Sequence, residues 1–491
     1  MRRKSFSSML KRALAAAVAI VLCAPAIDAA AAAPVNVGPA RQKFVRRAPP
    51  PKAIDWDRIT QEATELLSKY IQIDTTDPPG NELAAAKMLK EEFLEAGIPA
   101  TTWEPKPGRG IVAARLRGIG RHSKAIVLLS HLDVVPANPK EWSVPPFSGQ
   151  VKNGKIWGRG AIDDKGPGVI EAMAMIAIKR AGILLDRDVL FVATGAEEAG
   201  GKEGAGWFTD HQHAIFSDAG YLLNEGGAIR ARPGGRKVYL VAVTEKTPLW
   251  IKLTATGPAG HASEPPPETA VTRLVRALQK VIDFRTPVRV TGPVRDYYRA
   301  LARIDGGPKQ YLDLAAALKN PAYLRKFLSG PGRSAQVRDT ITPTILAAGI
   351  DTNVISPSAY AELDCRLLPG DDPAAFIAKL RKAIGDNSIR LDILLSFPPA
   401  ASPSRSPLMT AIETLAHRHD DAQVAPAMTI GFTDSHYFRR KKIVSYGFMP
   451  IELTAAETHG VHGIDEHIKV TELGEGIRRM VELLRIFGGR P

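Results

Sequence analysis

The chain has 491 residues, of which 45% are hydrophobic and 24% are charged. This is the composition of a soluble globular protein with a sizeable core and room for two or three domains. The formal net charge of +14 is concentrated near the start, because residues 1–33 carry +4 and residues 34–52 carry +5. The remaining chain carries only +5, so we do not expect nucleic-acid binding.

The first 33 residues have the pattern of a secretory signal peptide. The basic segment MRRKSFSSMLKR precedes the apolar stretch ALAAAVAIVLCAPAI, and DAAAAAP offers cleavage sites between small residues. We expect a secreted or periplasmic protein, with no transmembrane span in the mature chain because no second long apolar run occurs. Residues 34–53 form a basic, proline-rich leader whose charge would suit anionic lipid. Cleavage leaves Cys365 without a partner for an intrachain disulfide.

Helices and strands alternate in the next part of the chain. Apolar spacing predicts helices over 55–73, 82–97 and 168–182, and strands over 124–130, 188–194 and 220–225. This alternation predicts an α/β catalytic domain with a largely parallel central sheet flanked by helices. We place its first segment at residues 54–246.

From residue 247 the pattern changes. Strands are predicted over 249–257, 358–368 and 388–395, and helices over 267–282 and 372–385. Helices over 406–419 and 470–488 then return to the earlier character. The sequence therefore predicts a smaller α+β domain over 247–400, inserted between the first catalytic segment and a second segment at 401–491.

Carboxylates and an imidazole follow several of the predicted strands. In open α/β sheets, ligand sites gather beyond the carboxyl ends of the strands. Each residue alone is more often a structural hydrogen-bonding or surface group, but buried clusters of carboxylates repel one another unless cations neutralise them. The strand ends and their neighbouring loops present His131 and Asp133 in SHLDVVP, Asp163 and Asp164 in GRGAIDDKG, Glu197 and Glu198 in TGAEEAGG, and Glu225 in NEGG.

A late loop supplies further candidates. The stretch THGVHGIDEH contains His459, His462, Asp465 and Glu466. Imidazole nitrogen and carboxylate oxygen are ligands of zinc, and a catalytic zinc ion keeps one position for water or substrate. Together with the strand-end residues, this loop indicates a metal site, with either histidine as the late ligand.

In their order and spacing, the motifs SHLDVVP, GRGAIDDKG, TGAEEAGG, NEGG and HGIDE resemble those of the zinc-dependent M20 peptidase family. The resemblance covers roughly residues 55–485. That family includes carboxypeptidases, dipeptidases and aminoacylases. The resemblance implies a catalytic α/β domain with two Zn²⁺ ions per chain, interrupted by a lid or dimerisation domain. Co²⁺ or Mn²⁺ could replace Zn²⁺.

The resemblance also implies the roles of the metal ligands. His131 and Glu225 would bind one zinc ion, and Asp163 would bridge both ions. Glu198 and His462 would bind the other, since the family spacing His-x-x-Asp/Asn-Glu selects His462 over His459.

Two further residues complete the implied catalytic centre. Glu197 would be the general base, and Asp133 would orient His131 from behind. The implied activity is hydrolysis of a peptide bond that releases a C-terminal residue or splits a dipeptide. The alternative is an N-acyl-amino-acid amidohydrolase (aminoacylase), and a metal-binding homologue without catalysis is the third choice.

The inserted domain contributes candidates for substrate binding. GPAGHASEP resembles the lid motif of the family, in which His261 would contact the substrate carbonyl, often across a dimer interface. Asn353 would position the substrate backbone, and Arg366 would clamp a substrate carboxylate. A homodimer through this domain is therefore expected.

One stretch departs from the family pattern. GFTDSHYFR has Phe432 where a second glycine is common and His436 where arginine is common. A histidine there would weaken a contact with an anionic substrate or make it depend on pH.

Overall fold

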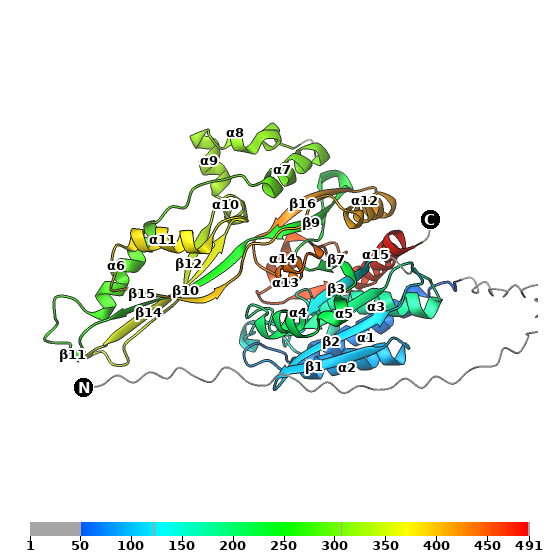
Figure 1. Ribbon diagram of the computed structural model, residues 1–491, viewed down its shortest axis with the longest axis horizontal. Coiled ribbons are helices and arrows are strands. Elements are labelled where there is room, and N and C mark those ends of the chain that lie inside the picture. The colour runs from blue at the N-terminus through cyan, green and yellow to red at the C-terminus, as the bar shows by residue number, and fades with distance from the viewer. Residues whose placement is uncertain (1–50, 121–122, 306, 490–491) are drawn as a thin grey trace, which may run out of the picture. The chain divides into compact units, whose positions relative to one another are not determined.

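The computed structural model describes residues 51–120, 123–305 and 307–489 (Figure 1). The predicted signal peptide, and the predicted leader except residues 51–53, lie outside the described residues. Among those that are described, none of the helices has both the length and the apolar character that crossing a membrane requires.

The first part of the described chain and its last part build one nine-stranded sheet. Its strands follow the order β1-β2-β6-β3-β7-β17-β9-β16, and β8 pairs with β9. The strands are β1 (Ala100–Lys106), β2 (Arg109–Leu116), β3 (Ala125–His131), β6 (Val189–Thr194), β7 (Ala219–Asn224), β8 (Ile229–Ala231), β9 (Lys237–Glu245), β16 (Gln423–Thr429) and β17 (Val444–Gly447).

The centre of this sheet is parallel and its margins are mixed. β3 runs parallel to both β6 and β7, and β17 runs parallel to β7. β2 pairs antiparallel with β1 and β6, whereas β16 pairs parallel with β9. The carboxyl ends of four central strands therefore lie along one edge, as the sequence predicted.

Helices cover both faces of this sheet. Every residue of β3 is buried, because Ile126 and Leu128 face one apolar cluster while Val127 and Leu129 face another. Strands buried on both faces have continuous apolar sequences rather than alternating ones. The first face packs against α1 (Trp56–Gln72), α2 (Glu82–Glu95), α3 (Lys165–Ala181), α12 (Pro407–Asp420) and α15 (Val470–Gly488). The second packs against α4 (Trp207–His211), α5 (His213–Phe216) and α13 (Ser435–Arg440).

The middle of the chain forms a second, antiparallel sheet in the order β12-β14-β10-β15 (Figure 1). Burial alternates along β14, so one face packs on helices and the other does not. The elements are β10 (Thr247–Thr256), β12 (Thr340–Ala348), β14 (Ser358–Leu367), β15 (Arg390–Ser396), α6 (Ala270–Asp283) and α11 (Pro373–Ile384). A short pair, β11 (Gly260–His261) and β13 (Val354–Ile355), extends from this sheet.

A helical segment between α6 and β12 was not predicted. It contains α7 (Gly292–Asp305), a 3-10 helix (Lys309–Asp313), α8 (Leu314–Ala317), α9 (Pro321–Leu328) and α10 (Pro331–Val337). Its own apolar cluster includes Tyr298, Phe327 and Met428, the last from β16. The segment therefore packs on a catalytic strand although it lies within the predicted insert.

The predicted fold class is confirmed, with a central mixed sheet flanked by helices and matched by solved structures described below. The exact domain boundaries at residues 247 and 400 stay predictions. A third, small sheet joins β4 (Val151–Lys152), β5 (Lys155–Trp157) and β18 (His467–Lys469). It brings the chain near residue 466 against the loop that follows residue 157.

Candidate metal centre

His131 ends the central strand β3 and is only 1% exposed. Its Nδ1–H donates to the backbone carbonyl of Asp133 at 3.0 Å. Nε2, the other ring nitrogen, faces Asp163, whose Oδ1 lies 2.9 Å away, and Glu225, whose Oε1 lies 3.9 Å away. A histidine whose other nitrogen is held by an acceptor is oriented as metal-binding histidines are.

Asp163 lies between two histidines. Its Oδ1 faces His131 at 2.9 Å, and its Oδ2 faces Nε2 of His462 at 3.2 Å. Burial opposes ionisation of this carboxyl, but hydrogen bonds to both histidines hold its pKa below the usual range. The two oxygens of one carboxylate thus point to two different imidazoles, as a bridging ligand requires.

The second imidazole group comes from the late loop. Nε2 of His462 lies 2.9 Å from Oε1 of Glu198. Hydrogen bonds to Asp163 and Glu198 raise the pKa of His462 to about 10. His462 has a φ of 57°, a left-handed backbone conformation that directs its ring. The alternative candidate His459 is exposed on α14 (Ala455–Gly460).

Glu197 and Glu225 lie next to the His131 side of this cluster. Ligand atoms of His131, Glu197 and Glu225 all lie within 4.8 Å of one another. Burial, and then the charge of Glu225, raise the pKa of Glu197 well above its usual value. Its Oε1 is buried without a hydrogen-bond partner among the described atoms. Such an atom is costly unless an ion, water or substrate completes it.

The hydrogen bonds of the Asp133 carboxylate go to Glu197 and Glu198 rather than to the ring of His131. Its Oδ1 lies 3.6 Å from Nδ1 of His131, too far for a hydrogen bond, so the backbone carbonyl is the nearer acceptor. The two carboxylate oxygens instead accept the backbone N–H groups of Glu197 and Glu198, each at 3.0 Å. Asp133 therefore fixes the turn that presents both glutamates.

Glu466 accepts four hydrogen bonds beside the cluster, a bracing position that the sequence did not reveal. Its Oε1 accepts the N–H groups of Ile162 and Asp163 at 2.7 and 3.1 Å. Its Oε2 accepts from Gly160 N and from Arg159 at 3.1 and 2.8 Å. Because Arg159 also donates to the carbonyl of Gly463, this network ties the His462 loop to the Asp163 loop. Glu466 belongs to the HGIDE motif, but the motif does not indicate that Glu466 binds the loop at residues 159–163.

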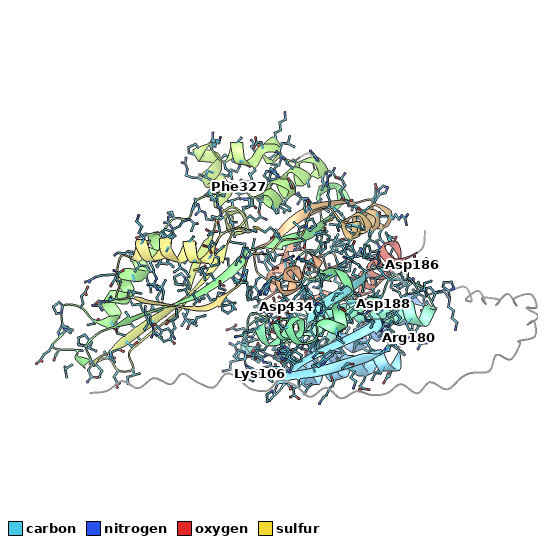
Figure 2. All side chains as sticks on the ribbon, in the orientation of Figure 1. Lys106, Arg180, Asp186, Asp188, Phe327 and Asp434 are labelled. Atoms are coloured by element: carbon cyan, nitrogen blue, oxygen red, sulfur yellow. The ribbon has the colours of Figure 1, made fainter. Side chains whose placement is uncertain are left out.

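Asp434 borders the same cluster from the loop before α13 and is labelled in Figure 2. Its Oδ2 accepts a hydrogen bond from Thr194, the last residue of β6, at 2.7 Å. Burial raises the pKa of Asp434 to about 7. This contact anchors the 430–436 loop to the strand end that precedes Glu197.

The donor set fits metal ions of the zinc type. Two groups of one imidazole nitrogen and carboxylate oxygens share Asp163, with separations of 2.9 to 3.9 Å. Ligand atoms around one tetrahedral zinc ion lie about 3.3 Å apart, given bonds of about 2.0–2.1 Å. Burial and the charge of Asp163 also raise the pKa of Glu198 and Glu225. A cation between these carboxylates would relieve that repulsion.

The structure places His261 and Asn353 together but exposed. His261 ends β11, and Asn353 lies in the turn just before β13, where the N–H of Ala262 donates to the carbonyl of Asn353 at 3.0 Å. Nδ1 of His261 lies 2.7 Å from Oγ of Ser263. Within the described part of the chain, no contact joins this pair to the carboxylate cluster, so their predicted roles are proposals.

Arg366 lies on the uncovered face of the inserted sheet. Its Nε and one terminal nitrogen donate to Asp364 at 2.7 and 2.8 Å. The other terminal nitrogen is buried without a described hydrogen-bond partner, and the guanidinium lies 4.8 Å from the ring centroid of Phe432. One donor therefore remains for a ligand.

Of the two effects expected of His436, its surroundings favour the weakened contact with an anion over the pH-dependent one. The ring is 2% exposed, stacks on Phe397 at 3.7 Å, and donates from Nδ1 to the carbonyl of Thr433. Burial lowers the pKa of His436 to about 3. It is therefore neutral near pH 7, and the expected pH-dependent contact with an anion does not arise from this side chain.

Comparison with known sequences decides the family. The sequence model described as "Peptidase family M20/M25/M40" matches residues 127–486, which include every residue of the cluster. The chain belongs to this family. The N-fatty-acyl-amino acid synthase/hydrolase PM20D1 of Xenopus tropicalis is 30% identical over 381 residues, covering 76% of this chain and 74% of that protein. The mouse protein of the same name is also 30% identical and covers 86% and 87%.

Solved structures of the M20 family share the fold. An M20 family metallo-carboxypeptidase from Sulfolobus solfataricus has a TM-score of 0.69 at 20% identity, covering 87% of this chain and 99% of that one. The di-peptidase Dug1p of Saccharomyces cerevisiae has a TM-score of 0.69 at 15% identity, covering 89% and 98%. The predictions of the M20 family and of a hydrolase of that family are confirmed.

Proposed function

We propose that this M20 protein hydrolyses an amide bond next to a free carboxylate, using two metal ions and Glu197 as the general base. The observation that carries the proposal is the division of Asp163 between His131 and His462, with Glu197 buried beside it. His131, Glu225 and Oδ1 of Asp163 would hold one ion. His462, Glu198 and Oδ2 of Asp163 would hold the other.

Two Zn²⁺ ions, with Co²⁺ or Mn²⁺ as alternatives, would supply Lewis-acid polarisation of the scissile carbonyl and a lowered pKa for the attacking water. Glu197 takes the proton of that water as the new C–O bond forms, and returns it to the nitrogen as the C–N bond breaks. The charge of bound metal ions would favour the ionised form of Glu197 despite its burial. Asp133 holds the Glu197 backbone in place throughout.

The substrate is the finer question. The relatives at 30% identity are named N-fatty-acyl-amino acid synthase/hydrolases, which supports an N-acyl amino acid. The sequence motifs alone favoured a peptide first and an N-acyl amino acid second. A peptide remains the other candidate, because a relative from Dictyostelium discoideum, 28% identical, is named a probable carboxypeptidase S-like 2. A non-catalytic homologue is disfavoured because the base Glu197 is retained with its ligands.

The inserted domain would bind the rest of the substrate. Arg366 has one terminal nitrogen without a described partner that could bind a carboxylate, and His261 and Asn353 are both exposed, at the end of β11 and just before β13. We propose that His261 acts in a homodimer formed through the insert. Exposed apolar residues support such an interface, namely Val275 and Ile282 on α6 and Leu346 on the edge strand β12.

We also propose export to the periplasm or cell exterior through cleavage of residues 1–33, on the pattern of that segment alone. Sequencing of the N-terminus of protein recovered from the periplasm or medium tests this: a start near residue 34 supports export, whereas retention of Met1 contradicts it.

A substrate panel tests the main proposal. The zinc-loaded protein is given dipeptides and N-acyl amino acids, each with a free and an amidated C-terminus, and the released amino acid is quantified. Hydrolysis of free-acid substrates alone is expected, with N-acyl amino acids ahead of dipeptides. Equal hydrolysis of the amidated set would remove the carboxylate requirement. No release from any substrate, with metal bound, would favour the non-catalytic alternative.

A further inference from the structure

The helical segment of the insert is far more basic than the rest of the folded chain. Residues 285–338 contain eleven lysines and arginines against three aspartates, a net charge of +8. The remainder of the chain from residue 53 onward carries −3. A modest overall charge therefore conceals a strong local excess. We call residues 285–338 the basic helical segment.

Much of this charge faces solvent without neutralisation. Arg295 pairs with Asp296, and Arg289 pairs with Asp371. Seven other exposed cations form no ion pair with another described residue, and two of these, Arg285 and Arg333, donate to backbone carbonyls. The remaining five have no described side-chain partner: Arg303, Lys309, Lys319, Arg325 and Lys326. Surface cations that are not paired internally remain available to an anionic partner.

Aromatic packing holds the elements that carry these cations together. The ring of Tyr298 on α7 lies 4.7 Å from that of Tyr311 in the 3-10 helix and 5.5 Å from that of Phe327 on α9, which Figure 2 labels. Arg299 donates to the carbonyl of Leu312 at 3.0 Å. The cations therefore belong to one packed unit rather than to separate loops.

An apolar component lies among the cations. Leu312 is 48% exposed, and its neighbour Tyr311 and Tyr323 on α9 are each partly exposed. Tyrosine combines a solvated hydroxyl with an apolar ring and is enriched where proteins contact lipid headgroups. Cations combined with an exposed leucine and tyrosines match a surface that is both anionic and apolar at shallow depth.

We propose that the basic helical segment docks the protein on an anionic lipid surface. The cations are distributed over α7, the 3-10 helix, α8 to α9 and their connections, which suits a broad charged plane better than one small anion. Residues 34–52 carry a further +5 of the same sign. The exposed Leu312 favours lipid over nucleic acid, whose backbone offers no apolar layer to receive it.

Vesicle sedimentation with the full chain tests the proposal. The parent is expected to bind phosphatidylcholine vesicles that contain phosphatidylglycerol, with affinity that falls as salt rises. Replacing the five cations without a described side-chain partner by glutamine should lower partitioning at least ~50-fold, because each cation near such a surface contributes roughly a factor of five. The matched control replaces five exposed lysines of the catalytic segments, Lys87, Lys140, Lys152, Lys179 and Lys202, by glutamine.

The two variants with five substitutions lose the same net charge and differ only in where the substituted residues lie. An equal loss of binding in both would overturn the proposal, as would equal binding to vesicles of phosphatidylcholine alone. Leu312→Asn should weaken vesicle binding by about threefold without altering binding to a DNA oligonucleotide. Loss of oligonucleotide binding with vesicle binding intact would assign the segment to nucleic acid instead. If the variant with five substitutions in the basic helical segment has a lower Tm than the parent, the double variant with Arg325→Gln and Lys326→Gln is used instead.

Discussion

The two sheets of this protein present side chains in opposite ways. In the catalytic sheet, parallel central strands are buried on both faces, and their carboxyl ends bring together residues more than 300 positions apart, such as His131 and His462. In the inserted sheet, antiparallel strands are covered on one face, and its candidate residues stay on the uncovered face or on extensions.

This difference separates two kinds of site. The catalytic cluster is held by partners from the same chain, because His131 is 1% exposed and His462, although its side chain is 52% exposed, contacts both Asp163 and Glu198. His261 and Asn353, by contrast, are exposed, and their described partners are local residues of the same short extension. A buried site can be complete within one chain, whereas an exposed pair acquires its partners from substrate or from a second copy.

The sharpest test of the enclosed site is Glu197→Gln. Removal of the base should lower kcat by roughly 10²- to 10⁴-fold, while metal content measured by mass spectrometry stays at the parent value because the ligands remain. Glu141→Gln, at an exposed glutamate, is the control. Parent-like turnover of Glu197→Gln would remove this residue from the mechanism.

Lys246 connects β9 of the catalytic sheet to β10 of the inserted sheet, and its titration should make the stability of the folded chain depend on pH. It is fully buried between β9 and β10, and its Nζ donates to the carbonyls of Ala335 and Arg338. Burial lowers the pKa of Lys246 to about 8. The unfolded chain, with a lysine pKa of about 10.4, binds the extra proton between these values, so stability rises with pH across that window by up to about 3 kcal/mol.

Urea unfolding of metal-free protein at several pH values between these two pKa values measures this rise. Lys246→Met should be less stable overall because two carbonyls lose their donor, but its stability should lack this lysine's share of the rise with pH. An identical pH dependence in parent and variant would show that Lys246 does not titrate there.

Glu466→Gln tests the network behind the metal ligands. The amide can accept fewer of the four hydrogen bonds, so metal affinity should fall by about 10- to 100-fold, as measured by competition with a chelator. Glu472→Gln is the matched control, since Glu472 also accepts a backbone N–H and pairs with an arginine, but on α15. Equal effects of both substitutions would indicate general destabilisation.

Arg366→Gln tests the uncovered face of the inserted sheet. Loss of the charged donor should raise KM for free-acid substrates by about tenfold while kcat changes little, because charge-assisted hydrogen bonds to carboxylates are strong. Arg390→Gln provides the control, since Arg390 also pairs with an aspartate two residues away on the same sheet. An unchanged KM, or an equal change for amidated substrates, would contradict a carboxylate clamp.

The smallest expected effect concerns the affinity of the proposed homodimer. Val275→Glu should raise the dissociation constant of the homodimer by roughly fivefold, because a half-exposed valine contributes about 1 kcal/mol when it is buried. Sedimentation equilibrium measures this constant, and Leu184→Glu, at an exposed leucine of the catalytic segment, is the control. A parent protein that stays monomeric at all concentrations would exclude the dimer.

Long, strongly patterned elements could be predicted from the sequence. The last helix runs over 470–488 as expected, and β3, α3 and β6 lie within a few residues of their predicted limits. The helical segment before β12 was not predicted. Its helices α8 to α10 have only four to eight residues each, and its apolar cluster includes Met428 of β16, remote in the sequence. β9 (residues 237–245) was not predicted either; it lies immediately before residue 247, where the predicted pattern changes.

The site divides in the same way. Each metal-ligand candidate follows a strand or belongs to a motif, so local sequence was sufficient to name it. The brace by Glu466 and the use of the Asp133 carboxylate by Glu197 and Glu198 depend on pairings across 64 to 307 positions. Such pairings are properties of the packed fold, which hydrophobic spacing does not encode.

The strand order has a consequence for how the protein is made. β17, synthesised after the insert, lies between β7 and β9, and His462 and Glu466 follow later still. The inserted sheet, whose strands all lie between residues 247 and 396, can form while the ribosome is still extending the chain. The catalytic sheet cannot close, and its metal pocket cannot gain the last histidine, until nearly the whole polypeptide has emerged. Under the proposed mechanism, a nascent chain is expected to be inactive until His462 has emerged, as is every truncation before residue 462.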